Sequence, residues 1–219
     1  MLIWDIETEG LPDAADAFDP SSVKVGNLKD AAKIAAKVAE AREQFIEKAA
    51  LSATTGRVLA IGYFDPAKEA VRVNGIGELE TADKDEAEVI EDFWNTAEDC
   101  RDRSVPLVGL NIHEFDLPFL VRRSWILDLM IPDWVMSQDR YWDPIFVDLR
   151  KKWLCGVRAT DVRSNFGELG AAFGTGGKTD GVTGADFSRL WWSDRTKAIE
   201  YLVNDVKQPA TWAYRMGVC

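Results

Sequence analysis

Acidic side chains near both ends of the chain have the types and spacings of a metal-binding catalytic site. Asp5 and Glu7 are two residues apart in an apolar segment, and side chains alternate along a β-strand, so both carboxylates are expected on one face. Tyr201 and Asp205 are four residues apart in a helical pattern, which places phenol and carboxylate on one helical face. Asp116 follows an apolar strand pattern where a helix begins. Sites in α/β sheets gather at strand ends, so these elements can bring the four carboxylates to one point.

Converging carboxylates determine which chemistry is possible there. They repel one another, so without a counter-charge some of them would have to be protonated. Oxygen ligands suit Mg²⁺ or Mn²⁺ rather than Zn²⁺, and two such ions about 3.5–4 Å apart support phosphodiester hydrolysis. An ordinary tyrosine has a pKa of about 10, so Tyr201 is a poor base, but its hydroxyl can orient the attacking water. Each pair of residues alone is more often an ordinary surface feature; the ordered set of three motifs favours a catalytic site.

Strand and helix patterns alternate along the chain and predict an α/β fold in one domain, residues 1–219. Apolar segments predict strands over residues 2–6, 58–64, 71–73, 107–110 and 145–149. Apolar spacing and capping residues predict helices over residues 29–50, 117–127 and 164–173, one opened by the pair Asp83 and Glu86, and one from about residue 194. The helix over 29–50 is an insertion between the first two strands. It covers a sheet face, clamps DNA or contacts another subunit, and the sequence does not decide between these roles.

Composition excludes several classes of protein. The 219 residues include 26 basic and 37 acidic side chains, a net charge of −11, which argues against a DNA coat, a histone-like protein or a membrane-surface binder. Three widely spaced cysteines without a CxxC pair argue against a disulfide scaffold and a structural zinc site. The sequence shows neither a signal peptide nor a membrane span, so we expect a soluble, cytoplasmic protein that does not bind membranes.

Three segments together resemble a known family. WDIET at residues 4–8, GLNIHEFDLPFL at 109–120 and YLVNDV at 201–206 resemble the three motifs of the DEDD superfamily of 3′–5′ exonucleases, in its tyrosine-bearing branch. The likeness is to the proofreading domains of family B DNA polymerases and to stand-alone polymerase-B-like exonucleases of bacteria and their phages. It implies a ribonuclease-H-like fold, a five-stranded mixed sheet flanked by helices.

The resemblance also implies roles for individual residues. It assigns two divalent cations, Mg²⁺ or Mn²⁺, to Asp5, Glu7, Asp116 and Asp205, with Tyr201 positioning the nucleophile. The residues it assigns to the substrate are Thr8 at the terminal nucleotide, Leu11 against the last bases, Asn111 and Phe115 along the 3′ end, and Lys178 over the scissile phosphate. The alternatives are core packing for Leu11 and Phe115, a turn for Asn111 and a solvent-exposed lysine at 178.

The implied activity is removal of nucleoside 5′-monophosphates from the 3′ end of single-stranded DNA by a two-metal-ion mechanism. A DNA polymerase or another replication or repair protein is the candidate protein partner. Two alternatives are open: an exoribonuclease, because no residue here reads the sugar 2′ position, and a catalytically silent nucleic-acid-binding or replisome module, which the intact acidic set disfavours. Residues 150–163 carry five basic side chains and one acidic one. They are a candidate track for the nucleic-acid backbone, or a chance cluster of charge.

Overall fold

A computed structural model of the chain describes residues 1–79, 82–137, 141–177 and 184–218. The strands are β1 (Leu2–Gly10), β2 (Gly56–Asp65), β3 (Ala70–Gly75), β4 (Gly77–Leu79), β5 (Ala82–Lys84), β6 (Leu107–Gly109), β7 (Met136–Ser137), β8 (Tyr141–Trp142) and β9 (Phe146–Asp148). The helices are α1 (Ala31–Glu47), α2 (Glu86–Asp102), α3 (Asp116–Ile126), α4 (Leu149–Leu154), α5 (Phe166–Phe173), α6 (Gly184–Ser193) and α7 (Arg195–Arg215). Three short 3₁₀ helices span Ala14–Ala17, Pro20–Ser22 and Ala49–Leu51. None of the helices in these described ranges is long and apolar enough to cross a membrane.

The chain divides into two compact units. One consists of Met1–Glu7 and Val58–Cys219, and the other is Thr8–Arg57, which is inserted between them and contains α1. The helix expected over residues 29–50 is α1, which is shorter at both ends. That residues 1–219 form one exonuclease domain stays a prediction.

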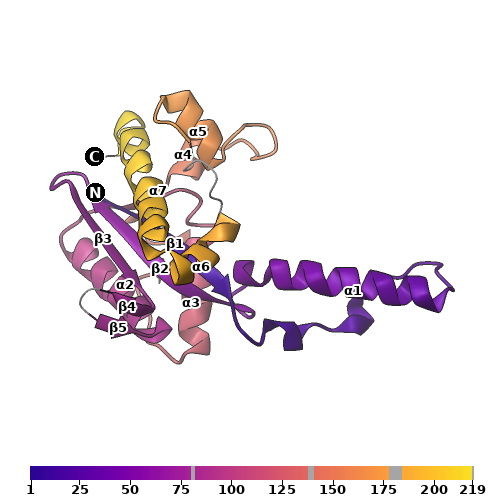
Figure 1. Cartoon of the computed structure of the whole chain (residues 1–219). Coiled ribbons are helices and arrows are strands. Elements are labelled where there is room, and N and C mark those ends of the chain that lie inside the picture. The colour runs from indigo at the N-terminus through magenta and orange to yellow at the C-terminus, as the bar shows by residue number, and fades with distance from the viewer. Residues whose placement is uncertain (80–81, 138–140, 178–183, 219) are drawn as a thin grey trace. The chain divides into compact units, whose positions relative to one another are not determined.

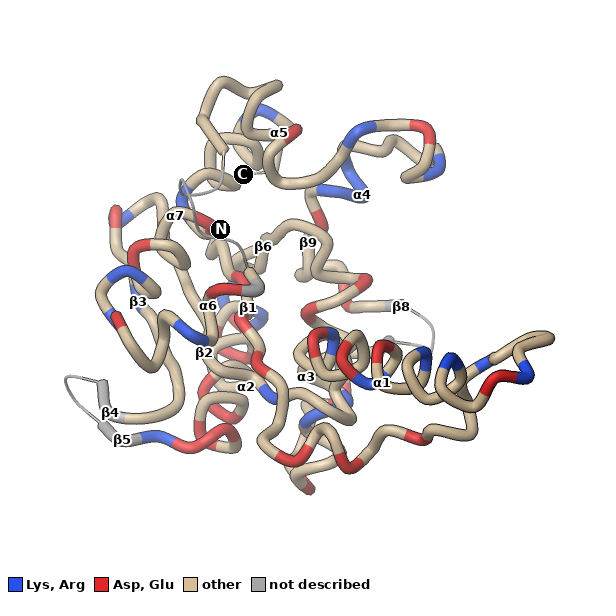
Figure 2. The backbone as a smooth tube through the Cα atoms, turned by 45° about the vertical axis from the view of Figure 1, so that its right-hand side comes forward, with Lys and Arg blue, Asp and Glu red and all other residues tan. Residues whose placement is uncertain are grey.

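The larger unit is built on a five-stranded mixed sheet with the strand order β3-β2-β1-β6-β9. Figure 1 labels β3, β2 and β1, and Figure 2 labels β6 and β9. β2 pairs antiparallel with β3, whereas β6 pairs parallel with both β1 and β9. All five strands predicted from the apolar segments are present in this sheet. The predicted α/β fold, with a five-stranded mixed sheet flanked by helices, is therefore confirmed.

Helices cover both faces of this sheet (Figure 1). On one face the ring of Trp4 in β1 lies 4.6 Å, between centroids, from that of Phe93 in α2. On the other face α7 lies so close to β2 that a Cβ atom at Gly62 would come within 2.7 Å of the Leu202 side chain. Glycine at position 62 is therefore needed for α7, the helix that carries Tyr201 and Asp205, to approach the sheet.

A buried ion pair joins α2 to α3. The Arg123 guanidinium donates to both carboxylate oxygens of Glu86, from Nε at 2.8 Å and from Nη2 at 2.6 Å, and Glu86 also accepts the backbone N–H of Val58 at 2.8 Å. Both side chains are at most 9% exposed. The pair fixes α3, whose first residue is Asp116, against α2 and the start of β2.

The prediction that Asp83 and Glu86 form the capping pair of a helix is wrong. Asp85 is the N-cap of α2, and Asp85 with Glu88 forms the capping box. The same spacing, aspartate followed three residues later by glutamate, occurs twice in this acidic stretch, and Glu86 bonds Arg123 instead.

Other element boundaries also differ from the predictions. The N-cap of α5 is Asn165 rather than Ser164, and the Ser164 hydroxyl accepts from Arg150 Nε at 3.1 Å. The short helix α4 and the helix α6 were not predicted, because α4 has too few residues for a periodic pattern and α6 follows a glycine-rich segment.

Candidate active site

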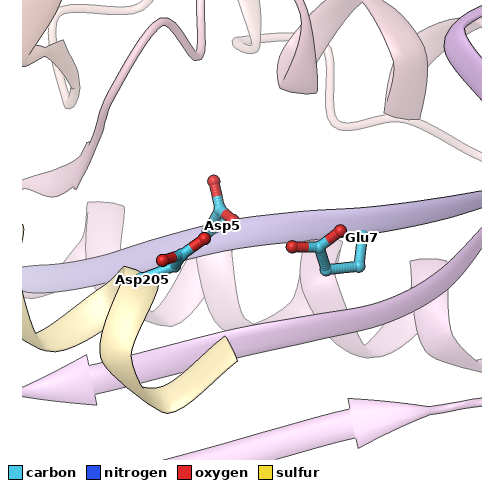
Figure 3. A group of neighbouring side chains, drawn as sticks. All are labelled: Asp5, Glu7 and Asp205. Carbon is cyan, nitrogen blue, oxygen red and sulfur yellow. The ribbon is translucent and has the colours of Figure 1, made fainter. Parts of the chain in front are cut away.

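Three carboxylates from β1 and α7 meet in the larger unit. Asp5, Glu7 and Asp205 each offer an oxygen, and these oxygens all lie within 4.8 Å of one another. Figure 3 shows Asp5 and Glu7 on the same strand, with Asp205 reaching them from the helix. The three side chains could hold a metal ion between them.

Strand alternation and helix packing explain this meeting. Because neighbouring residues of a strand point to opposite faces, Asp5 and Glu7 lie on the face opposite Trp4, which contacts α2. The face that Asp5 and Glu7 share is the one that α7 covers, and Asp205 is buried against it at 6% exposure. The expected placement of the two β1 carboxylates is therefore observed.

Tyr201 belongs to the same group of side chains. It lies one helical turn before Asp205, hydrogen-bonds that carboxylate and is fully buried, with its ring centroid 5.9 Å from that of Phe187. Burial raises the pKa of Tyr201 well above its ordinary value, and the charges of Asp205, Glu7 and Asp5 raise it further. The hydroxyl therefore keeps its proton at neutral pH, so it can orient a water molecule but cannot act as a base.

Asp116 contacts the strand between the two β1 carboxylates. β6 ends at Gly109, and the Oδ1 atom of Asp116 accepts the backbone N–H of Ile6 at 3.2 Å. The side chain is 3% exposed. Burial raises the pKa of Asp116 to about 7, the charge of Asp148 acts in the same direction, and backbone hydrogen bonds oppose the shift. Asp116 is outside the group of three oxygens within 4.8 Å, yet it is anchored beside both of their β1 members.

Asp148 is a functional candidate that the sequence did not indicate. It is 4% exposed, and its carboxylate accepts four backbone N–H groups: Asn111 at 3.0 Å, His113 at 3.0 Å, Arg150 at 2.8 Å and Lys151 at 3.2 Å. Two of these donors lie in the loop that leads from β6 to Asp116, and the other two open α4. Asp148 therefore fixes the loop before Asp116, and we consider it a positioning residue. Its only signal in the sequence was its place at the end of a predicted strand.

The residues expected to contact the substrate are placed as follows. Asn111 has a positive φ of 64°, and its Oδ1 atom accepts from Arg150 at 2.7 Å, so it is a turn residue with a bonded side chain. Phe115 precedes α3 and is half-buried, with its ring 5.6 Å from that of Phe119. Their contacts with a nucleic acid stay predictions.

Thr8 and Leu11 belong to the inserted unit. The Thr8 hydroxyl donates to the Ala50 carbonyl at 2.7 Å, and the Leu11 N–H donates to the Thr55 carbonyl at 2.8 Å. Lys178 lies outside the described residues. The substrate contacts expected of Thr8, Leu11 and Lys178 stay predictions too.

Comparison with known families identifies the class of enzyme. Residues 49–213 match a family model described as "Predicted 3'-5' exonuclease related to the exonuclease domain of PolB". The chain belongs to this family. The matched range includes Asp116, Tyr201 and Asp205, whereas Asp5 and Glu7 precede it. This PolB-related family confirms the predicted 3′–5′ exonuclease and the resemblance to polymerase-B-like exonucleases.

A solved structure shows the same fold. The chain is similar to the family B DNA polymerase from the hyperthermophilic archaeon Pyrobaculum calidifontis, with a TM-score of 0.57 and 17% sequence identity. The match covers 98% of this chain and 24% of the polymerase, so the chain spans about a quarter of that protein's length. None of the curated proteins compared with the chain matches it in sequence.

The donor set fits the divalent metal ion that exonucleases of this class need. Three carboxylates that converge from two elements repel one another, and a bound cation offsets this repulsion. Hard cations such as Mg²⁺ and Mn²⁺ prefer carboxylate oxygens. Asp5, Glu7 and Asp205 would hold the cation, and Asp116 lies beside them with one oxygen on the Ile6 N–H.

The raised pKa of Asp116 predicts a pH-dependent stability of the metal-free protein. Its carboxyl binds a proton more tightly in the folded state, with a pKa of about 7, than in the unfolded state, with a pKa of 3.8. The contribution of the Asp116 carboxyl to the free energy of unfolding is therefore complete below about pH 4 and is lost as the pH rises through 7. Urea unfolding in chelator should therefore show the wild type losing stability, relative to Asp116→Asn, between pH 4 and 7. Parallel pH profiles for the two proteins would contradict this prediction.

The role of Asp148 predicts a loss of metal affinity when it is replaced. Asp148→Asn should lower the free energy of unfolding by about 1–3 kcal/mol, because an amide satisfies fewer of the four N–H groups. It should also raise several-fold the Mn²⁺ concentration that gives half-maximal nuclease rate. Asp143→Asn is the matched control, since Asp143 accepts the Ile145 N–H at 3.0 Å in the preceding turn. An equal effect of both variants on the Mn²⁺ dependence would exclude the positioning role.

Proposed function

We propose that this 3′–5′ exonuclease acts on single-stranded DNA, is used with Mg²⁺ or Mn²⁺ and belongs to the tyrosine-bearing branch of its superfamily. The observation that carries the proposal is the meeting of Asp5, Glu7 and Asp205 within 4.8 Å, with Tyr201 hydrogen-bonded to Asp205. A buried tyrosine beside three carboxylates matches the motif that distinguishes this branch.

Each residue has a distinct task in the proposed hydrolysis. Asp5, Glu7 and Asp205 would hold two cations, and Asp116 would join them after losing its proton. Bound Mg²⁺ or Mn²⁺ supplies the positive charge that acidifies water and stabilises a leaving oxygen in phosphodiester hydrolysis. Tyr201, which keeps its proton, orients the attacking water.

The bond changes define the products. A water molecule loses a proton to the solvent as its oxygen attacks the phosphorus of the last phosphodiester bond. The bond between this phosphorus and the O3′ atom of the preceding nucleotide breaks, and O3′ takes up a proton from the solvent. The products are a nucleoside 5′-monophosphate and a strand shorter by one residue.

The net negative charge of the chain is compatible with a site that binds only a few nucleotides, since bound cations supply the local positive charge. A DNA polymerase or another replication or repair protein is the proposed protein partner.

The proposal predicts a ladder of products from a labelled strand. A single-stranded DNA labelled at its 5′ end should shorten one nucleotide at a time with Mg²⁺ or Mn²⁺ and stay intact with chelator. Asp205→Asn should reduce this activity to background, whereas Glu200→Gln, an exposed acid on the same helix, should leave it within about twofold of the wild type. One large early product would indicate an endonuclease, and a ladder from RNA alone would indicate an exoribonuclease.

The role of Tyr201 predicts a separation of rate from metal binding. Tyr201→Phe should lower kcat about 100-fold, because the hydroxyl that orients the water is lost, and should leave Mn²⁺ affinity within about twofold of the wild type. Tyr214→Phe is the control, since Tyr214 lies on α7 with 72% of its surface exposed. A large loss of Mn²⁺ binding in Tyr201→Phe, measured by calorimetry, would contradict the role in orienting water.

A further inference from the structure

The inserted unit differs in charge from the rest of the chain. Thr8–Arg57 carries seven basic and eight acidic side chains, a net charge of −1, whereas the rest of the chain carries 19 basic and 29 acidic ones, a net charge of −10. Figure 2 shows both signs of charge along α1. Taken as a whole, this unit is therefore less repelled by a polyanion than the rest of the chain taken as a whole.

Helix α1 is arranged unfavourably for its own stability. None of its 17 residues, all of which the structure describes, is buried, so core packing contributes little to the helix. Its N-cap Asp30 and C-cap Lys48 suit the helix dipole, but its first turn has no acid and its last turn no base that would add to this stabilisation. Lys33 and Lys37 repel each other one turn apart, as do Glu43 and Glu47.

A pocket in the same unit has three basic side chains close to two aromatic rings. Its volume is about 740 Å³, and it lies between α1 and the segments on either side of that helix. Lys24, Lys37 and Lys48 line it, and Phe18 and Phe45 meet there with ring centroids 5.6 Å apart. The remaining lining groups include the neutral side chains of Gln44, Ser52 and Thr54.

Charge in this pocket favours an anion. Against its three lysines stands one acid, Asp19, whose carboxylate already accepts the N–H and the hydroxyl of Ser21, each at 2.8 Å. Both aromatic rings are half-buried, so part of each is open to a ligand. Aromatic faces that stack bases, ringed by cations that meet phosphates, are the combination that binds single-stranded nucleic acid without reading its sequence.

We propose that this pocket, lined by Phe18, Phe45, Lys24, Lys37 and Lys48, binds a nucleotide of the single strand at a position upstream of the 3′ end being cleaved. The inference rests on the proposed function for the identity of the strand. A second binding site for the same strand raises the effective concentration of its 3′ end at the carboxylates, because the pocket and the carboxylates belong to one chain. It offers an acidic nuclease a way to hold a polyanion without placing lysines at its catalytic carboxylates.

Binding in chelator tests this inference separately from hydrolysis. The probe is a 20-residue oligo(dT) with a 5′ fluorophore, titrated with the full-length protein at several salt concentrations. Lys24→Gln/Lys37→Gln/Lys48→Gln should weaken binding about tenfold or more and make the slope of log K against log salt shallower by about 2, at about 0.7 per lost phosphate contact. Lys29→Gln/Lys33→Gln/Arg42→Gln is the matched control, which removes three exposed charges of the same unit from outside the pocket and should change Kd less than about twofold.

Hydrolysis of a short substrate and photocrosslinking test the location of the bound nucleotide. The pocket variant should hydrolyse the dinucleotide pdTpdT, which spans only the scissile bond, at the wild-type rate, and should raise KM for the 20-residue strand. Photocrosslinking with 5-iododeoxyuridine within the strand should label a peptide that contains Phe18 or Phe45. Equal effects of the two triple variants, or crosslinks confined to residues outside 8–57, would overturn the inference. Pocket-dependent binding by a wild type that yields no ladder would refute the proposed function but support nucleotide binding in the pocket.

Discussion

Repulsion between carboxylates is the constraint on which the rest of the structure depends. Carboxylate oxygens of Asp5, Glu7 and Asp205 lie within 4.8 Å of one another. The neighbouring Tyr201 is neutral and does not offset their negative charge. Rigid elements must hold such a group together, and either protonation or a bound cation relieves its repulsion. The sheet supplies one rigid part through β1, and the close packing of α7 on Gly62 supplies the other. The packing of the last helix on the central sheet thus holds these acids together against their repulsion.

Two buried aspartates extend that arrangement without joining the group of three. Asp116 bonds the N–H of Ile6, between Asp5 and Glu7, and Asp148 collects four N–H groups around the loop that leads to Asp116. Burial is the main cause of the raised pKa of Asp116, and the charge of Asp148 adds to it. A divalent cation bound beside Asp116 would favour its deprotonated form.

The sequence predicted the sheet and the central carboxylates because both depend on local rules. Apolar segments marked all five strands, and alternation placed Asp5 and Glu7 on one face. Asp148 was missed because its partners are backbone groups up to 37 residues away, which leave no trace in residue types. α6 was missed because it follows a glycine-rich segment. Its packing on the sheet depends on a distant residue, since a Cβ at Gly75 of β3 would lie 2.2 Å from the Trp191 ring. The capping pair of α2 was misplaced because acids recur at the same spacing in that stretch.

Crystals soaked in Mn²⁺ and measured at the manganese absorption edge test the central claim most directly. The account predicts anomalous density between the carboxylates of Asp5, Glu7 and Asp205, and its loss in crystals of Asp205→Asn. Density that is absent from these three side chains at Mn²⁺ concentrations that support nuclease activity would contradict the account.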